Sequence, residues 1–195
     1  MRFKTFYLKE TTSNSLIVVD IQPSYKKYFG FKVSDLCDHL INSDYDKILY
    51  LYNGPELGME TKDDILNFLI EDGLDYDEEK VEQIPNMTFY EKNYAFFRDM
   101  MDDGYDEDDI IKLIKYMIDN KIDNSQNIDD ETFEELDIEP LGSGNRIWIP
   151  EVLDELKKYN NIILCGGGRN ECLREIEIAL KVLNKPYKLL NKFVY

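Results

Sequence analysis

The residues with the clearest chemical potential lie near the end of the chain, in a glycine-rich turn followed by a cysteine. An apolar run at residues 162–165 predicts a buried strand, three glycines follow at 166–168, and a segment with helical spacing begins near Cys172. Strand, turn and helix in this order bring backbone N–H groups and a helix N-terminus together, where negative charge is stabilised. A thiol there is expected to have a lowered pKa, which favours a nucleophilic cysteine beside an oxyanion site. The alternative is a buried structural cysteine beside a glycine turn.

Two other residues stand where they could act with this cysteine. Asp20 ends a continuous apolar run at residues 16–19, and ligands of parallel sheets bind beyond the carboxyl ends of the strands. Lys92 lies within an aromatic stretch, residues 87–97, where aromatic walls could lower its pKa or a carboxylate could pair with it. The alternatives are a turn aspartate and a lysine whose stem lies along the rings with its ammonium in water.

Alternating strand and helix patterns predict the scaffold that would position these residues. Strands are expected at 16–20, 46–52, 162–165 and 187–195, with a looser candidate at 2–8. Helices are expected after Ser34, after Thr61, from Pro150 and from Cys172. This alternation predicts an α/β fold, a three-layer α/β/α sandwich around a mainly parallel, Rossmann-like sheet.

The composition limits the classes of function. A chain of 195 residues with a formal net charge of -17 predicts one domain, and it disfavours binding to nucleic acid or to an anionic membrane. No run approaches transmembrane length and no signal peptide is expected; three widely spaced cysteines indicate a reducing, cytoplasmic compartment. With one histidine, a metal site built on several histidines is excluded, and no cofactor is expected.

An acidic segment at about 101–145 interrupts the strand–helix alternation. Residues 101–140 carry 15 acidic side chains against three lysines. Helical spacing at 110–118, and again around Phe133, predicts an acidic helical insertion that forms a cap or an interaction surface outside the sheet core. Residues 102–106 lack the spacing and closing glutamate of a calcium-binding EF-hand loop.

Three motifs in order resemble the isochorismatase-like cysteine hydrolase superfamily, which includes nicotinamidases and related amidases. The first is a strand ending in Asp20-x-Gln22 with Tyr25 downstream, and the second is Lys92 followed by an aromatic cluster that contains Phe96. The third is a helix, a strand, a glycine and then Cys172, over residues 150–172. The resemblance covers about three-quarters of the chain in outline. It implies a single isochorismatase-like domain over residues 1–195.

The resemblance also implies roles for particular residues. Cys172 would be the nucleophile, Asp20 the general base and Lys92 the charged partner of both, as a thiol attack on a carbonyl requires. The backbone N–H groups of Gly168 and Cys172 would form the oxyanion hole, next to a cis peptide bond between Gly167 and Gly168.

Further residues are implied in substrate binding: Gln22, Tyr25 and Phe96, together with Arg169. Arg169 replaces a threonine common in the family, and it could recognise a carboxylate or phosphate or pair with Glu171. Nicotinamidases bind a metal through an aspartate and two histidines, which this chain lacks, so no metal site is expected.

The first functional hypothesis is a metal-independent cysteine hydrolase that acts on a small amide, or on a related carbonyl or enol ether. The alternative is a catalytically inactive isochorismatase-like protein that binds a protein partner through the acidic helical insertion. A third is an acidic decoy that occupies a nucleic-acid-binding surface. Self-association into a homo-oligomer is also left open.

Overall fold

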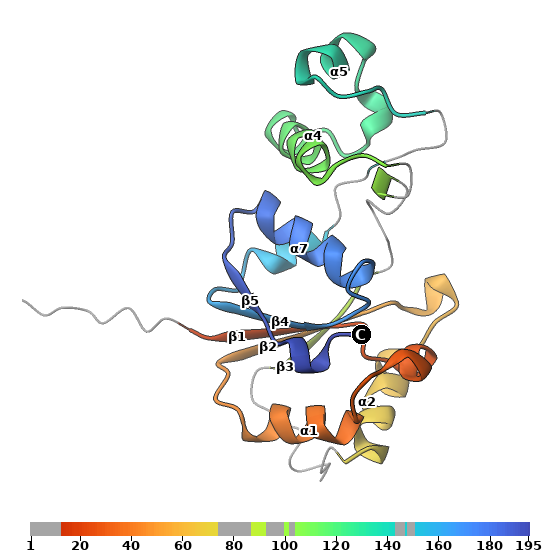
Figure 1. The fold of residues 1–195 in the computed structure, drawn as a ribbon, viewed down its shortest axis with the longest axis vertical. Helices are drawn as coiled ribbons and strands as arrows, with labels where there is room; N and C mark the ends of the chain where they lie inside the picture. Colours follow the sequence, from red (N-terminus) through yellow and green to blue (C-terminus); the bar gives the residue numbers. More distant parts are fainter. Residues whose placement is uncertain (1–12, 74–86, 93–99, 102–103, 143–146, 148–150) are drawn as a thin grey trace, which may run out of the picture.

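The computed structural model describes residues 13–73, 87–92, 100–101, 104–142, 147 and 151–195. Its five strands form one sheet in the order β3-β2-β1-β4-β5, and every neighbouring pair is parallel (Figure 1). The strands are β1 (Ser15–Val19), β2 (Lys47–Tyr52), β3 (Met87–Glu91), β4 (Ile162–Gly166) and β5 (Tyr187–Leu189). The predicted α/β class with a parallel sheet is therefore confirmed.

Helices cover both faces of this sheet (Figure 1). One face carries α1 (Val33–Asn42) and α2 (Lys62–Glu71), and the other carries α6 (Val152–Leu156) and α7 (Cys172–Val182). Beyond α7 lie α4 (Glu107–Asn120) and then α5 (Asp130–Leu136). Short 3-10 turns complete the description: η1 (Pro23–Tyr28), η2 (Pro55–Leu57), η4 (Ser125–Asn127) and η5 (Asn191–Phe193).

The strands supply apolar side chains to both faces because successive residues of a strand point to opposite sides. In β1, Leu16 and Val18 pack toward α1 and α2, while Ile17 and Val19 pack toward α6 and α7. All four side chains are fully buried. This two-sided burial explains why β1 reads in the sequence as an unbroken apolar run.

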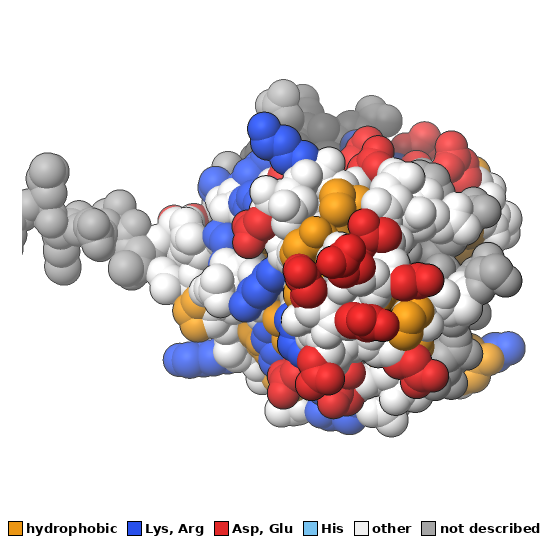
Figure 2. Space-filling model, turned by 90° about the horizontal axis from the view of Figure 1, so that it is seen from above, with side chains coloured by type: hydrophobic (Ala, Val, Ile, Leu, Met, Phe, Trp, Pro, Cys, Tyr) orange, Lys and Arg blue, Asp and Glu red, His pale blue; other side chains and the backbone are white. Residues whose placement is uncertain are grey.

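The acidic segment is helical, through α4 and α5. The apolar side of α4 is buried against α7, in the hydrophobic cluster that continues to the sheet. The buried residues of α4 are Ile110, Leu113, Ile114 and Met117. The apolar stripe of α4 therefore packs on α7, with α7 between α4 and the sheet (Figure 1). Acidic side chains gather on the opposite, outward surface (Figure 2).

Some element boundaries differ from the predicted ones. The helix expected after Ser34 begins two residues earlier than predicted, at Val33, with Lys32 at the N-cap position. The predicted capping box at Thr61 is present, since Thr61 and Asp64 exchange hydrogen bonds at the start of α2.

The C-terminal strand is shorter than predicted. It covers only Tyr187–Leu189, and the chain then turns through η5 to reach Tyr195. The aromatic stretch before Lys92 proved to be an edge strand, β3, which the sequence analysis did not identify. The expected strand at 2–8 and the helix start at Pro150 lie outside the described residues. Within the described ranges, no helix is long and apolar enough to cross a membrane.

Candidate active site

The candidate site lies where the order of the strands reverses, at the carboxyl edge of the sheet. From β1 the chain proceeds to β2 and β3 on one side, and β4 and β5 lie on the other. In open parallel sheets the loops diverge at such a point and leave a crevice for a ligand. Asp20 directly follows β1, Asn53 follows β2, Lys92 follows β3, and the turn to Cys172 follows β4.

Asp20 and Lys92 form a buried ion pair at this edge. The Lys92 Nζ lies 2.7 Å from Asp20 Oδ2, and the two side chains are 3% and 0% exposed. Backbone hydrogen bonds fix both residues: Asp20 N–H donates to Leu51 O (2.9 Å) and Lys92 N–H donates to Tyr52 O (2.8 Å). Burial is the largest influence and lowers the pKa of Lys92, but Asp20, Cys172 and Glu175 together outweigh it and leave that pKa raised. The ammonium is therefore charged at neutral pH.

Cys172 is the first residue of α7 and lies against this pair. The pKa of its thiol is raised to about 12, first by burial and then by the charge of the Asp20 carboxylate, while Lys92 opposes this rise. The lowered pKa expected from the helix N-terminus is therefore wrong, because desolvation and a neighbouring anion outweigh the helix dipole and the ammonium. At rest, Cys172 is therefore a thiol beside the Asp20 carboxylate.

Glycines shape the turn between β4 and α7. Gly166 has a φ of 81°, and a Cβ there would lie 2.1 Å from Val19 O, so only glycine lets the turn pass this close to β1. The Gly168 carbonyl accepts hydrogen bonds from Glu171 N–H (3.0 Å) and Leu173 N–H (3.2 Å). The N–H groups of Gly168 and Cys172, the predicted oxyanion donors, take no part in these bonds. The expected cis bond after Gly167 is absent, since the described chain contains no cis peptide bond.

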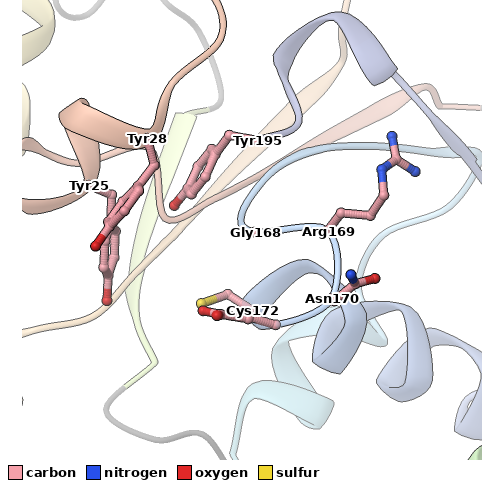
Figure 3. Close-up of a pocket in the computed structure, with 8 residues that line it drawn as sticks. Tyr25, Tyr28, Gly168, Arg169, Asn170, Cys172 and Tyr195 are labelled. Carbon is pink, nitrogen blue, oxygen red and sulfur yellow. The ribbon is translucent and has the colours of Figure 1, made fainter.

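A cavity of about 710 Å³ opens beside Cys172. The Cys172 sulfur faces Tyr25, Tyr28 and Tyr195 across this space (Figure 3). The Tyr195 hydroxyl donates to the backbone oxygen of Asp20 (2.9 Å), and its ring lies 6.4 Å from that of Tyr25, centroid to centroid. The cavity thus has the candidate nucleophile on one side and tyrosine side chains on the other.

Gln22 faces protein groups and does not line the cavity. Its Oε1 accepts from Asn53 N–H (3.0 Å), and its Nε2 donates to Asn53 O (3.2 Å) and to Glu60 Oε2 (2.5 Å). The substrate contact expected of Gln22 is corrected to a supporting role, because these bonds hold Asn53 in place.

Asn53 and Tyr195 belong to the site but were not identified from the sequence. Asn53 Oδ1 accepts from Lys92 Nζ (3.1 Å), and its Nδ2 donates to the Tyr25 hydroxyl (3.2 Å). Its position directly after an apolar strand is the same signal that pointed to Asp20. For Tyr195 no local signal exists, because a 3-10 turn far along the chain brings it to Asp20.

The remaining predicted site residues divide into three cases. Tyr25 lines the cavity, as expected of a substrate-binding residue. The guanidinium of Arg169 points away from Cys172, and its Nη2 donates to Asn191 Oδ1 at 2.7 Å (Figure 3). Phe96 lies outside the described residues.

Histidine takes no part in this arrangement. His39, the one histidine in the sequence, lies in α1, where its ring contacts Tyr45 and Ser43. In the parts of the chain that the structure describes, no three His, Cys, Asp or Glu side chains gather as metal ligands would.

Comparison with models of known protein families gives no match, and comparison with curated proteins gives none either.

Proposed function

We propose that the protein is a metal-independent cysteine hydrolase that acts on a small amide or a related small-molecule substrate. Its fold would be an isochorismatase-like three-layer sandwich, with α4 and α5 as an acidic helical insertion. One observation carries the proposal: Asp20, Lys92 and Cys172, distant in sequence, meet beside one cavity at the strand-order reversal. A nucleophile, a base in contact with it and a third group that orients the base are the parts that covalent catalysis requires.

The protonated resting thiol assigns a definite task to Asp20. As the sulfur attacks the substrate carbonyl, the carboxylate takes the thiol proton, and it later returns that proton to the leaving amine. Lys92 holds the carboxylate in position through the 2.7 Å ion pair and stabilises negative charge on sulfur during the transfer. The N–H groups of Gly168 and Cys172 would donate to the oxyanion of the tetrahedral intermediate. Water then hydrolyses the thioester, with Asp20 again as the base.

A substrate-profiling screen tests this proposal. Wild-type protein and the variants Cys172→Ser and Asp20→Asn would be compared on a panel of small amides, with the released amine or ammonia measured. Turnover by wild type that both variants lose supports the triad. Turnover that survives in Cys172→Ser would show that another group carries the reaction.

A non-catalytic protein-binding role is the second candidate, and the outward acidic surface of α4 and α5 favours it (Figure 2). A basic protein partner would complement this charge. If this candidate is right, binding weakens steeply with salt and survives Cys172→Ser. A partner whose affinity is insensitive to salt would contradict it.

A further inference from the structure

Among the described residues that line the cavity, none directs a cationic group at Cys172 (Figure 3). Of the described residues that line it, Arg169 alone has a cationic side chain, and its guanidinium is turned toward Asn191. The backbone N–H of Arg169 also donates to Tyr195 O (2.8 Å), which fixes the residue in this orientation. Arg169 was the residue expected to bind a carboxylate or phosphate of the substrate, and in this orientation its guanidinium does not face the cavity beside Cys172.

Carboxylates surround the candidate nucleophile instead. Glu171 lines the cavity one residue before Cys172, and the charge of Asp20 acts on the thiol. Glu175, 4% exposed and three residues into α7, acts electrostatically on both Cys172 and Lys92. Among these carboxylates, Asp20 forms the ion pair with Lys92.

The Asp20–Lys92 ion pair is largely neutral as a unit, because the two charges lie 2.7 Å apart. The carboxylate that the lining of the cavity contributes is that of Glu171. A carboxylate at this position attracts a cation and repels an anion.

The opposite wall suits a cation as well. Tyr25 and Tyr195 meet the cavity with aromatic side chains (Figure 3), and the Tyr28 ring already has Lys27 Nζ 4.8 Å from its centroid. The face of an aromatic ring attracts a cation within about 6 Å of its centroid, and desolvation strengthens this attraction.

We infer that the cavity beside Cys172 takes a positively charged small molecule, such as an ammonium-, amidinium- or guanidinium-bearing amide. This inference rests on the proposed function and names its substrate class. The charged group would lie between the tyrosine wall and Glu171, and the amide carbonyl would meet the Cys172 sulfur.

Three methanethiosulfonate reagents with matched chain lengths test the charge preference. They would carry a trimethylammonium, a neutral and a sulfonate end group; each forms a disulfide with Cys172 and releases methanesulfinate. The labelling rate at Cys172 would be measured by peptide mass mapping. Each rate is divided by the rate of the same reagent with a small free thiol, which corrects for differences in reactivity among the reagents. The cationic reagent should exceed the anionic one on the order of tenfold in this normalised rate.

Charge-matched variants separate a local effect from the net charge of the protein. Glu171→Gln should reduce the cation-to-anion ratio several-fold, while Glu134→Gln, at an exposed position on α5, should leave it unchanged. Equal rates, a faster anionic reagent, or no labelling of Cys172 by any reagent would overturn the inference. Labelling needs no turnover, so an absence of hydrolysis in the amide screen contradicts only the proposed function.

Discussion

At the scale of single residues, the chemistry depends on how Asp20 and Lys92 act on one thiol. Desolvation keeps Cys172 protonated, and Asp20 adds to this effect while Lys92 opposes it. A base in contact with a protonated nucleophile can deprotonate it during attack, so the thiolate need not exist beforehand. The inert resting thiol thereby avoids unproductive oxidation or alkylation, which thiolates undergo.

The opposed influences of the two residues predict opposite effects on alkylation. The wild-type rate of Cys172 with iodoacetamide should rise with pH from neutral to about pH 10 without a plateau, since its pKa is about 12. At a pH well below the pKa, lowering the pKa of the thiol by one unit raises the thiolate fraction about tenfold. Asp20→Asn should therefore speed alkylation, and Lys92→Met should slow it. A plateau near pH 8 in wild type, or slower alkylation in Asp20→Asn, would contradict the assignment.

Cys37 and Cys165 serve as internal references in this measurement. Both are buried in the native protein, and burial raises the pKa of Cys165 to about 12. Cys172 should react first because it is the more accessible thiol. Circular dichroism of each variant would confirm that a changed rate does not come from unfolding.

At the scale of elements, the turn after β4 sets where Cys172 lies. Gly166→Ala would place a methyl group 2.1 Å from Val19 O at a positive φ, so β1 and β4 would have to separate. We expect a loss of at least about 2 kcal/mol in the free energy of unfolding, measured by urea denaturation. Gly30→Ala is the control, because no atom lies within 4 Å of its added methyl group. Equal stability of the two variants would show that the turn relaxes freely.

The contact between α4 and α7 has an electrostatic anchor. Glu107, in the first turn of α4, pairs with Arg174 and Lys181 of α7. Glu107→Gln should cost about 1 kcal/mol, because the side chain is only partly exposed and meets two cations. Asp154→Asn removes an ion pair whose carboxylate is 81% exposed and should change stability far less. If both variants lose the same stability, the anchor has no special role.

The sequence predicted the secondary-structure elements better than it predicted the burial and the charged neighbours of individual side chains. The apolar run at Leu16–Val19 identified β1 because two-sided burial leaves a local pattern, and the same logic placed Asp20 and Cys172 at one edge. The protonation of Cys172 could not be predicted this way, since burial and the approach of Asp20 arise only after folding. Tyr195 was missed for the same reason, whereas the helical spacing at residues 110–118 did identify the apolar side of α4.

At the scale of the whole molecule, the buried thiols make the fold sensitive to alkali. Cys165 and Cys172 have pKa values raised from 9.0 to about 12, so the native state keeps protons that the unfolded state loses. Their stabilising contribution is complete below about pH 9 and falls as the pH rises toward 12. Each thiol can remove up to about 1.4 kcal/mol per pH unit in this window. Urea midpoints measured from pH 7 upward should fall, and Cys165→Ala should make the fall less steep; an unchanged slope would contradict the assignment for Cys165.

The most direct test of the central claim is intact-mass detection of an acyl-enzyme. Wild-type protein would be quenched during reaction with an activated ester of a small cationic acid, and the modified peptide would be identified. The account predicts a transient thioester on Cys172, absent in Cys172→Ser, formed more slowly in Lys92→Met, and slow to hydrolyse in Asp20→Asn because the base for water is lost. No adduct on Cys172, or an adduct that decays equally fast in Asp20→Asn, would contradict a Cys172–Asp20–Lys92 hydrolase.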